Sequence, residues 1–249
     1  MIRQLIPRET TEWVLHAINH SLGTEGMDRD ALPILRSQTY CTELTETTTI
    51  TDLVNATDLT PVVESLLGAG NLQRQKYGQI ALRFPGTTED APAAPHGHLD
   101  GLGSGLNGSA IGKFSRGFTC FAVVYLQDVP EPNCGNFTVW PGSHRVLEDY
   151  LRNEGPDVLS RGQPPLDWPH EPVQIRGRAG DVCLAHHQVI HGAAPNISPR
   201  IRYAAIFRLH HVKCEENGLK SMTNIWLEFP GLRSVGADVR AQPVSPGSS

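Results

Sequence analysis

Residues 95–100 read Pro95-His96-Gly97-His98-Leu99-Asp100, and the expected fold can be worked out from this stretch. Side chains two residues apart on an extended chain point to the same face, so His98 and Asp100 can aim an imidazole and a carboxylate at one point. Nitrogen combined with carboxylate suits iron, manganese or zinc better than calcium or a thiolate-binding metal. A His-x-Asp triplet often arises by chance, so a metal site also requires a third ligand elsewhere in the chain.

The segments around this stretch have the pattern of short strands separated by turns. The 19 prolines and 24 glycines favour turns and short strands over long helices. Apolar runs bounded by proline, glycine or polar residues predict strands at 79–84, 118–127, 136–140, 173–175, 182–185 and 202–211. A helix is expected at 146–153, and one further element at 225–229. Many short strands after an N-terminal helical part predict an α+β fold with a mainly β core, built as an antiparallel sandwich or barrel.

The helical part is expected to cover about residues 1–70. Apolar residues recur at spacings of three and four between positions 9 and 22 and predict one buried helical face, namely Trp13, Val14, Ala17, Ile18 and Leu22. Thr60 and Pro61 predict the N-cap and first position of a second helix, which Gly68 would end. The threonine-rich run from 45 to 51 is expected to form a loop or a short strand.

Composition and charge exclude several classes of protein. The chain has 249 residues, of which 39% are hydrophobic, and its formal net charge of −5 argues against a nucleic-acid-binding protein. No apolar run approaches the roughly 20 residues that cross a bilayer, and the N-terminus lacks the apolar segment of a signal peptide. Five cysteines without a C-x-x-C motif indicate reduced thiols and a cytoplasmic location. We expect one domain over 1–239 and a disordered tail at 240–249.

Candidates for the third metal ligand lie close together near residue 190. His186, His187 and His191 fall within six residues and follow a predicted strand. Two histidines and one carboxylate with open positions form the facial triad of non-heme Fe(II) oxygenases. Arg202 lies eleven residues after His191, at the start of an apolar strand, and a guanidinium group there could hold a dicarboxylate.

Four separate stretches agree in order and spacing with one known family. They are Gln79–Arg83; Gly97–Asp100; Gly135–Arg145; and Gly180-Asp181 continuing to His191-Gly192, Pro195-Asn196, Ser198 and Arg202. On these residues the chain resembles the phytanoyl-CoA dioxygenase family of Fe(II)- and 2-oxoglutarate-dependent oxygenases. The resemblance spans roughly residues 75–210 and implies a double-stranded β-helix, or jelly roll, with iron at its mouth.

The resemblance also implies a set of site residues. His98, Asp100 and His191 match the iron ligands of the family, and Arg202 matches the arginine that pairs with the distal carboxylate of 2-oxoglutarate. Gln79 matches a strand glutamine near the co-substrate. Two threonines could donate hydroxyl groups to the same site, namely Thr119 and Thr138. Among the other histidines, His144 matches a family residue that is not a ligand, whereas His186 and His187 lack the eleven-residue spacing to an arginine.

The implied reaction uses O2 and 2-oxoglutarate, and it releases succinate and CO2 while a small-molecule substrate is oxidised. The substrate would be a natural product, an amino-acid-like molecule or an acyl compound. Asp100 favours hydroxylation or a related oxidation, because related halogenases carry a small residue in place of this carboxylate. Lys113 and Arg116, in the glycine-rich segment 101–117, could meet an anionic substrate, although loop charges are more often solvated.

Two alternatives compete with this hypothesis. A cupin-like isomerase or ligand-binding protein would bind metal through a His-x-His pair such as His96 and His98, without using 2-oxoglutarate. A cupin would also need a glutamate a few residues later, and the segment 101–105 supplies none. The second alternative is an interaction domain whose histidines are structural.

Overall fold

Two β-sheets and a layer of helices form the fold seen in the computed structural model, which describes residues 1–28, 30–86 and 94–232. The four-stranded sheet has the order β1-β7-β2-β5, and the three-stranded sheet has the order β4-β3-β6. The strands are β1 (Gln79–Arg83), β2 (Cys120–Tyr125), β3 (Phe137–Val139), β4 (Val173–Gln174), β5 (Val182–His186), β6 (His191–Ala193) and β7 (Arg202–Leu209). Every pairing within the two sheets is antiparallel. The predicted jelly roll with a mainly β core is confirmed.

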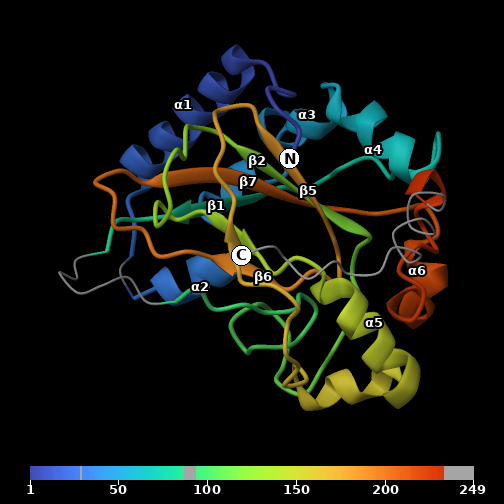
Figure 1. The fold of residues 1–249 in the computed structure, drawn as a ribbon. Helices are drawn as coiled ribbons and strands as arrows, with labels where there is room; N and C mark the ends of the chain where they lie inside the picture. The colour runs from blue at the N-terminus through green and yellow to red at the C-terminus, as the bar shows by residue number, and fades with distance from the viewer. Residues whose placement is uncertain (29, 87–93, 233–249) are drawn as a thin grey trace, which may run out of the picture.

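The helices surround these sheets. They are α1 (Arg8–Glu25), α2 (Leu32–Ser37), α3 (Thr48–Asn55), α4 (Leu59–Leu67), α5 (Ser143–Glu154) and α6 (Cys214–Asn217), with short 3-10 turns at Thr42–Leu44, Pro156–Arg161, Gly218–Met222 and Pro230–Leu232. Figure 1 shows α1, α3 and α4 on one side of the four-stranded sheet and β6 on the other. Within the described residues, no helix is both long enough and apolar enough to span a bilayer.

The alternation of side chains along the strands separates a core face from a cavity face. Tyr203, Ala205, Phe207 and Leu209 of β7 are buried in the same apolar cluster as residues of α1, α3 and α4. The intervening residues point to the opposite face, because successive side chains of a strand alternate. That face lines a cavity between the two sheets, and its contributions from β7 are Arg202, Ile206 and Arg208.

Three local predictions in the helical region are wrong. The run from 45 to 51 does not form a loop or strand throughout, because α3 begins at Thr48 and buries Ile50 completely. Thr60 does not cap α4; the helix begins at Leu59, and the Thr60 hydroxyl donates to the carbonyl of Val54. Trp13 is 64% exposed although it was expected on the buried face of α1.

The strands were predicted more accurately than the helical part. All six predicted strands are present with slightly different bounds, whereas β6 was not predicted as a strand. The element expected at 225–229 forms turns and has no regular secondary structure. The tail expected at 240–249 and the boundary at residue 239 lie outside the described residues, so the single-domain division stays a prediction.

Candidate metal centre and cavity

His98 and His191 are held opposite each other by an isolated β-bridge. The backbone N–H of His98 donates to the carbonyl of His191 at 2.9 Å, and the reverse bond is 3.1 Å long. His191 begins β6, which pairs with β3 on its other side. A β-carbon at Gly192 would lie 2.2 Å from the carbonyl oxygen of His96, so glycine is required for this close approach. The backbone therefore positions both imidazoles before any metal binds.

Asp100 completes a cluster of three potential ligands, and one ligand atom from each residue lies within 4.8 Å of the others. The Oδ1 atom of Asp100 lies 3.3 Å from Nε2 of His98 and 3.6 Å from Nε2 of His191. Two donors bound at about 2.1 Å and at right angles around one metal ion would be about 3 Å apart. The two separations from Asp100 exceed that value by about 0.3 and 0.6 Å, so its carboxylate needs only a small movement to share one ion with either imidazole.

His191 is in a state suited to metal binding. Its Nδ1 atom lies 3.0 Å from the carbonyl of Val189, which makes Nδ1 the protonated nitrogen and leaves the Nε2 lone pair directed at the cluster. Burial, with the nearby His98 ring as the next cause, lowers the pKa of His191 to about 4. The imidazole is therefore neutral at pH 7, as a metal ligand must be.

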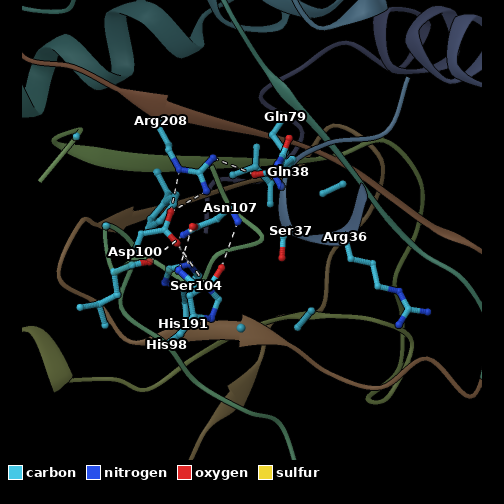
Figure 2. A pocket seen from close by; sticks show the side chains of 18 of the residues that line it. Arg36, Ser37, Gln38, Gln79, His98, Asp100, Ser104, Asn107, His191 and Arg208 are labelled. Atoms are coloured by element: carbon cyan, nitrogen blue, oxygen red, sulfur yellow. Dashed lines mark hydrogen bonds and ion pairs between the residues drawn. The ribbon is translucent and has the colours of Figure 1, made fainter. Parts of the chain in front are cut away.

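Arg208 holds the second oxygen of Asp100. Its Nε and Nη2 atoms contact Oδ2 at 2.8 and 2.7 Å, and its Nη1 donates to the Gln79 side chain at 2.9 Å. Figure 2 shows Asp100 between Arg208 and the two histidines. Burial alone would raise the pKa of Asp100, but the hydrogen bond with His98 and the charge of Arg208 outweigh burial and hold this pKa well below its usual range. Arg208 therefore leaves Oδ1 as the carboxylate oxygen that faces both imidazoles.

Arg202 is the first residue of β7 and also lines the cavity. Its Nε donates to the carbonyl of Gly135 at 2.7 Å and its Nη1 to that of Ala81 at 2.9 Å, whereas Nη2 has no partner among the described residues. Burial, followed by the like charge of Arg83, lowers the pKa of Arg202 to about 10, so the guanidinium remains charged at pH 7. This geometry presents one fixed cation to the cavity.

The cavity has a volume of about 900 Å³ and is lined by residues of both sheets. Its walls include the metal cluster, Gln79, Arg202 and Arg208, together with part of the glycine-rich segment 101–117. Two aromatic rings of the cavity wall lie beside His191: the ring centroids of Phe121 and Phe137 are 4.5 and 5.6 Å from that of His191. Such a space suits a co-substrate and a small molecule together.

The sequence matches the model of one protein family over residues 39–204, which is more than half of the chain. That model is described as phytanoyl-CoA dioxygenase (PhyH). The chain belongs to the phytanoyl-CoA dioxygenase family. This family comprises iron- and 2-oxoglutarate-dependent oxygenases, so the predicted relationship is confirmed. No curated sequence matches the chain significantly.

Solved structures with a similar fold include two enzymes of nogalamycin biosynthesis. The non-heme α-ketoglutarate-dependent epimerase SnoN aligns with a TM-score of 0.53 and 21% identity over 82% of this chain and 73% of its own. The α-ketoglutarate-dependent carbocyclase SnoK aligns with a TM-score of 0.51 and 19% identity over 100% of this chain and 88% of its own. SnoN in complex with Fe3+, α-ketoglutarate and nogalamycin RO aligns with a TM-score of 0.50 and 18% identity over 82% and 75%. At these identities the likeness establishes a shared fold.

Two predicted co-substrate residues of this phytanoyl-CoA dioxygenase family member do not reach the cavity. Thr119 is fully buried, donates its hydroxyl to Glu228 at 2.6 Å and accepts the backbone N–H of His211 at 2.9 Å. Thr138 points away from the cavity because its neighbour Phe137 occupies the inward position of β3, and its hydroxyl donates to the carbonyl of Asn136. Neither threonine is placed to bind 2-oxoglutarate.

The other charged residues and histidines that the sequence suggested also lie outside the cavity wall. Arg116 does not face the cavity but forms a buried ion pair with Glu228. Lys113 is exposed, as expected of a loop charge. His186 and His187 bond to the backbone of Ile225 and Thr119 and lie outside the metal cluster found among the described residues. The sequence analysis missed Arg208. Strand alternation could have revealed it, because residues 202 and 208 of one strand point to the same face.

Proposed function

We propose that this protein is an Fe(II)- and 2-oxoglutarate-dependent oxygenase that hydroxylates a small molecule, with His98, Asp100 and His191 as the iron ligands. The observation that carries the proposal is the convergence of Nε2, Oδ1 and Nε2 from these residues within a large cavity that also contains a fixed arginine. Two imidazoles and a carboxylate match the donor preference of Fe(II) and leave coordination positions open. When bound, iron and 2-oxoglutarate supply the oxidising chemistry with O2 and release succinate and CO2.

The protein residues position the reactants and tune their surroundings. Arg202 offers its free Nη2 to the distal carboxylate of 2-oxoglutarate, and two backbone carbonyls keep its guanidinium from turning away. Gln79 lies on the cavity wall and anchors Arg208, which in turn holds Asp100 through one oxygen. Phe121 and Phe137 exclude water from the side of His191 that faces the sheets.

Hydroxylation is favoured over halogenation because Asp100 occupies a position that a halide-binding enzyme of this kind would leave without a carboxylate. The similar structures described as an epimerase and a carbocyclase show that this fold also supports other outcomes of substrate oxidation. Hydroxylation, stereochemical inversion and ring formation would share the residues named above. Product analysis by mass distinguishes them, since only hydroxylation adds one oxygen atom to the substrate.

Anaerobic addition of Fe(II) and then 2-oxoglutarate tests the proposal. We expect a weak visible charge-transfer band that is lost in an Asp100→Ala variant, together with slow succinate formation once O2 is admitted. The matched control is Asp149→Ala, because Asp149 is an exposed carboxylate on α5 far along the chain from the cluster. A wild-type protein that shows neither the band nor a thermal shift with 2-oxoglutarate would contradict the proposal.

A further inference from the structure

The cavity of this acidic protein carries an excess of positive charge. Among the residues that the structure describes, its walls contain four arginines and one carboxylate, that of Asp100, whereas the whole chain has a formal net charge of −5. The four arginines are Arg36, Arg83, Arg202 and Arg208. If the proposed function holds, the two positive charges of Fe(II) and the two negative charges of 2-oxoglutarate cancel. The surplus of positive charge therefore remains for the substrate to meet.

Two of the four arginines already have partners. Arg208 is bound to Asp100 and Gln79, and Arg202 is tied to two backbone carbonyls and serves the co-substrate. Arg36 and Arg83 have guanidinium groups without an ion pair or hydrogen bond to any described residue. They are thus the two cavity cations that neither the described chain nor the co-substrate uses.

Arg83, Arg202 and Arg36 form one end of the cavity. Arg83 on β1 stands directly opposite Arg202 on β7 in the antiparallel register, so both side chains are on the cavity face. Gly135, with φ of 74°, packs closely against both arginines. A β-carbon at this position would lie 2.8 Å from Cβ of Arg83 and 3.1 Å from Cβ of Arg202. Figure 2 shows Arg36 on the side of the cavity away from the histidines.

Like charges gathered in this way are unfavourable without an anion. Burial and then the charge of Arg36 lower the pKa of Arg83, and Arg83 in turn lowers that of Arg202. The Tyr40 hydroxyl acts electrostatically on both Arg83 and Arg202, is buried, and has no hydrogen-bond partner among the described residues. An anionic group at this end of the cavity would relieve the repulsion and accept hydrogen bonds from the guanidinium groups.

We propose that Arg83 and Arg36 form an anion subsite for the substrate, so that the enzyme acts on a small molecule bearing a carboxylate or phosphate group. Arg83 contacts the anion from the cavity wall, and Arg36, which is exposed on α2, contacts it from the open side. Ser37 and Gln38 add polar groups at the same wall, and Gln38 donates to the carbonyl of Leu106 at 2.9 Å, which links α2 to the glycine-rich segment. Lys113 and Arg116, which lie in that segment, do not line this subsite.

Calorimetric titration of small anions tests this subsite without knowledge of the substrate. The full-length protein is loaded with Ni(II), which prevents turnover, and titrated with methylphosphonate or propionate in the presence and absence of saturating 2-oxoglutarate. Dimethyl methylphosphonate serves as the uncharged probe. We expect at least one of the two anions to bind while 2-oxoglutarate is present and the neutral ester not to bind. The stronger of the two anions identifies the group as phosphate-like or carboxylate-like.

Variants assign the binding to the named arginines. Arg83→Gln and Arg36→Gln should each weaken anion binding about tenfold, because each removes a charge-assisted contact. Arg36→Gln is the safeguard against misfolding, since its side chain is exposed. Arg176→Gln, which removes an exposed arginine that does not line the cavity, should leave the anion affinity within about twofold.

Each outcome supports or overturns the inference. Anion binding that is abolished by 2-oxoglutarate would overturn it, because the anion would then occupy the co-substrate position. Equal binding of the charged and neutral probes, or equal affinities in wild type and both variants, would also overturn it. Protein that binds 2-oxoglutarate but neither anion would overturn this inference and leave the proposed function standing, whereas anion binding without 2-oxoglutarate binding would contradict the proposed function alone.

Discussion

Replacing Glu228 by glutamine is expected to destabilise the protein severely, because Glu228 compensates a buried charge. Its carboxylate is 1% exposed and the Arg116 side chain 2% exposed. Arg116 donates to both carboxylate oxygens, and Thr119, Asn217 and Ser221 donate at 2.6, 3.0 and 3.3 Å. Glutamine has almost the same shape but no charge, and it must turn one NH2 group toward these donors. The variant therefore leaves the Arg116 guanidinium buried without a counter-ion.

The expected loss follows from the burial of both groups. Removing one partner of a fully buried ion pair costs about 3–5 kcal/mol, whereas an exposed pair contributes about 0–1 kcal/mol. The substitution should also disturb the cavity wall, because Arg116 lies between Ser115 and Gly117 in the chain and both of these residues line the cavity. A double variant, Arg116→Met with Glu228→Gln, removes both charges while the glutamine Oε1 still accepts hydrogen bonds from its neighbours, and it should recover much of the stability.

Urea unfolding at pH 7.5, followed by circular dichroism, measures these differences as free energies of unfolding. Glu215→Gln is the matched control, because Glu215 is exposed and its substitution should change the free energy by less than about 0.5 kcal/mol. A loss below about 1 kcal/mol for Glu228→Gln would refute the reasoning, since it would mean that water or another group compensates Arg116. A double variant no more stable than the single one would refute the assignment of the cost to the buried charge.

Three further predictions concern pH, the metal ligands and a close backbone contact. Burial lowers the pKa of His144 to about 4 and that of His186 to about 3, so on acidification the unfolded chain takes up these protons before the folded protein does. The free energy of unfolding should therefore fall as the pH drops from about 6.5 to about 4. A urea midpoint that stays constant over this range would contradict the prediction. Arg208→Gln should weaken metal affinity or activity about 10- to 100-fold through the freed Asp100 oxygen, measured by metal competition, and unchanged affinity and turnover would exclude this positioning role. Gly192→Ala should lower the free energy of unfolding in urea by about 1–3 kcal/mol and disturb metal binding. Gly117→Ala should lower it far less, because a β-carbon there would meet nothing within 4 Å. Equal losses of stability in the two variants would contradict the steric argument.

Local sequence patterns predicted most of the strands, and the resemblance to the family completed the predicted metal cluster. Alternating or continuous apolar runs between proline and glycine residues identified six of the seven strands found in the described part of the chain. The same-face rule for residues two apart placed His98 with Asp100, and the eleven-residue spacing to an arginine that the family resemblance implies favoured His191 over its neighbours. These patterns survive in a single sequence because each depends on residues near one another or on the order of motifs in the family. The strand β6 was missed because its residues, His191, Gly192 and Ala193, include no large apolar, β-branched or aromatic side chain that would indicate a strand.

Only the tertiary structure decided which side chains share the cavity and which are buried elsewhere. The sequence alone did not settle the parity of Thr119 and Thr138, and a single-residue difference in register sends a side chain to the other face. The pairing of Arg116 with Glu228 joins residues 112 positions apart, and that of Arg208 with Asp100 joins residues 108 positions apart. The sequence, through its resemblance to the family, predicted a jelly roll that carries His98, Asp100 and His191 as metal ligands, and the structure brings these three side chains together. The packing of distant segments decided that Arg208 contacts Asp100, and that Arg83 and Arg36 line the cavity without an ion-pair partner among the described residues. Contacts of this kind depend on tertiary packing that no local pattern encodes.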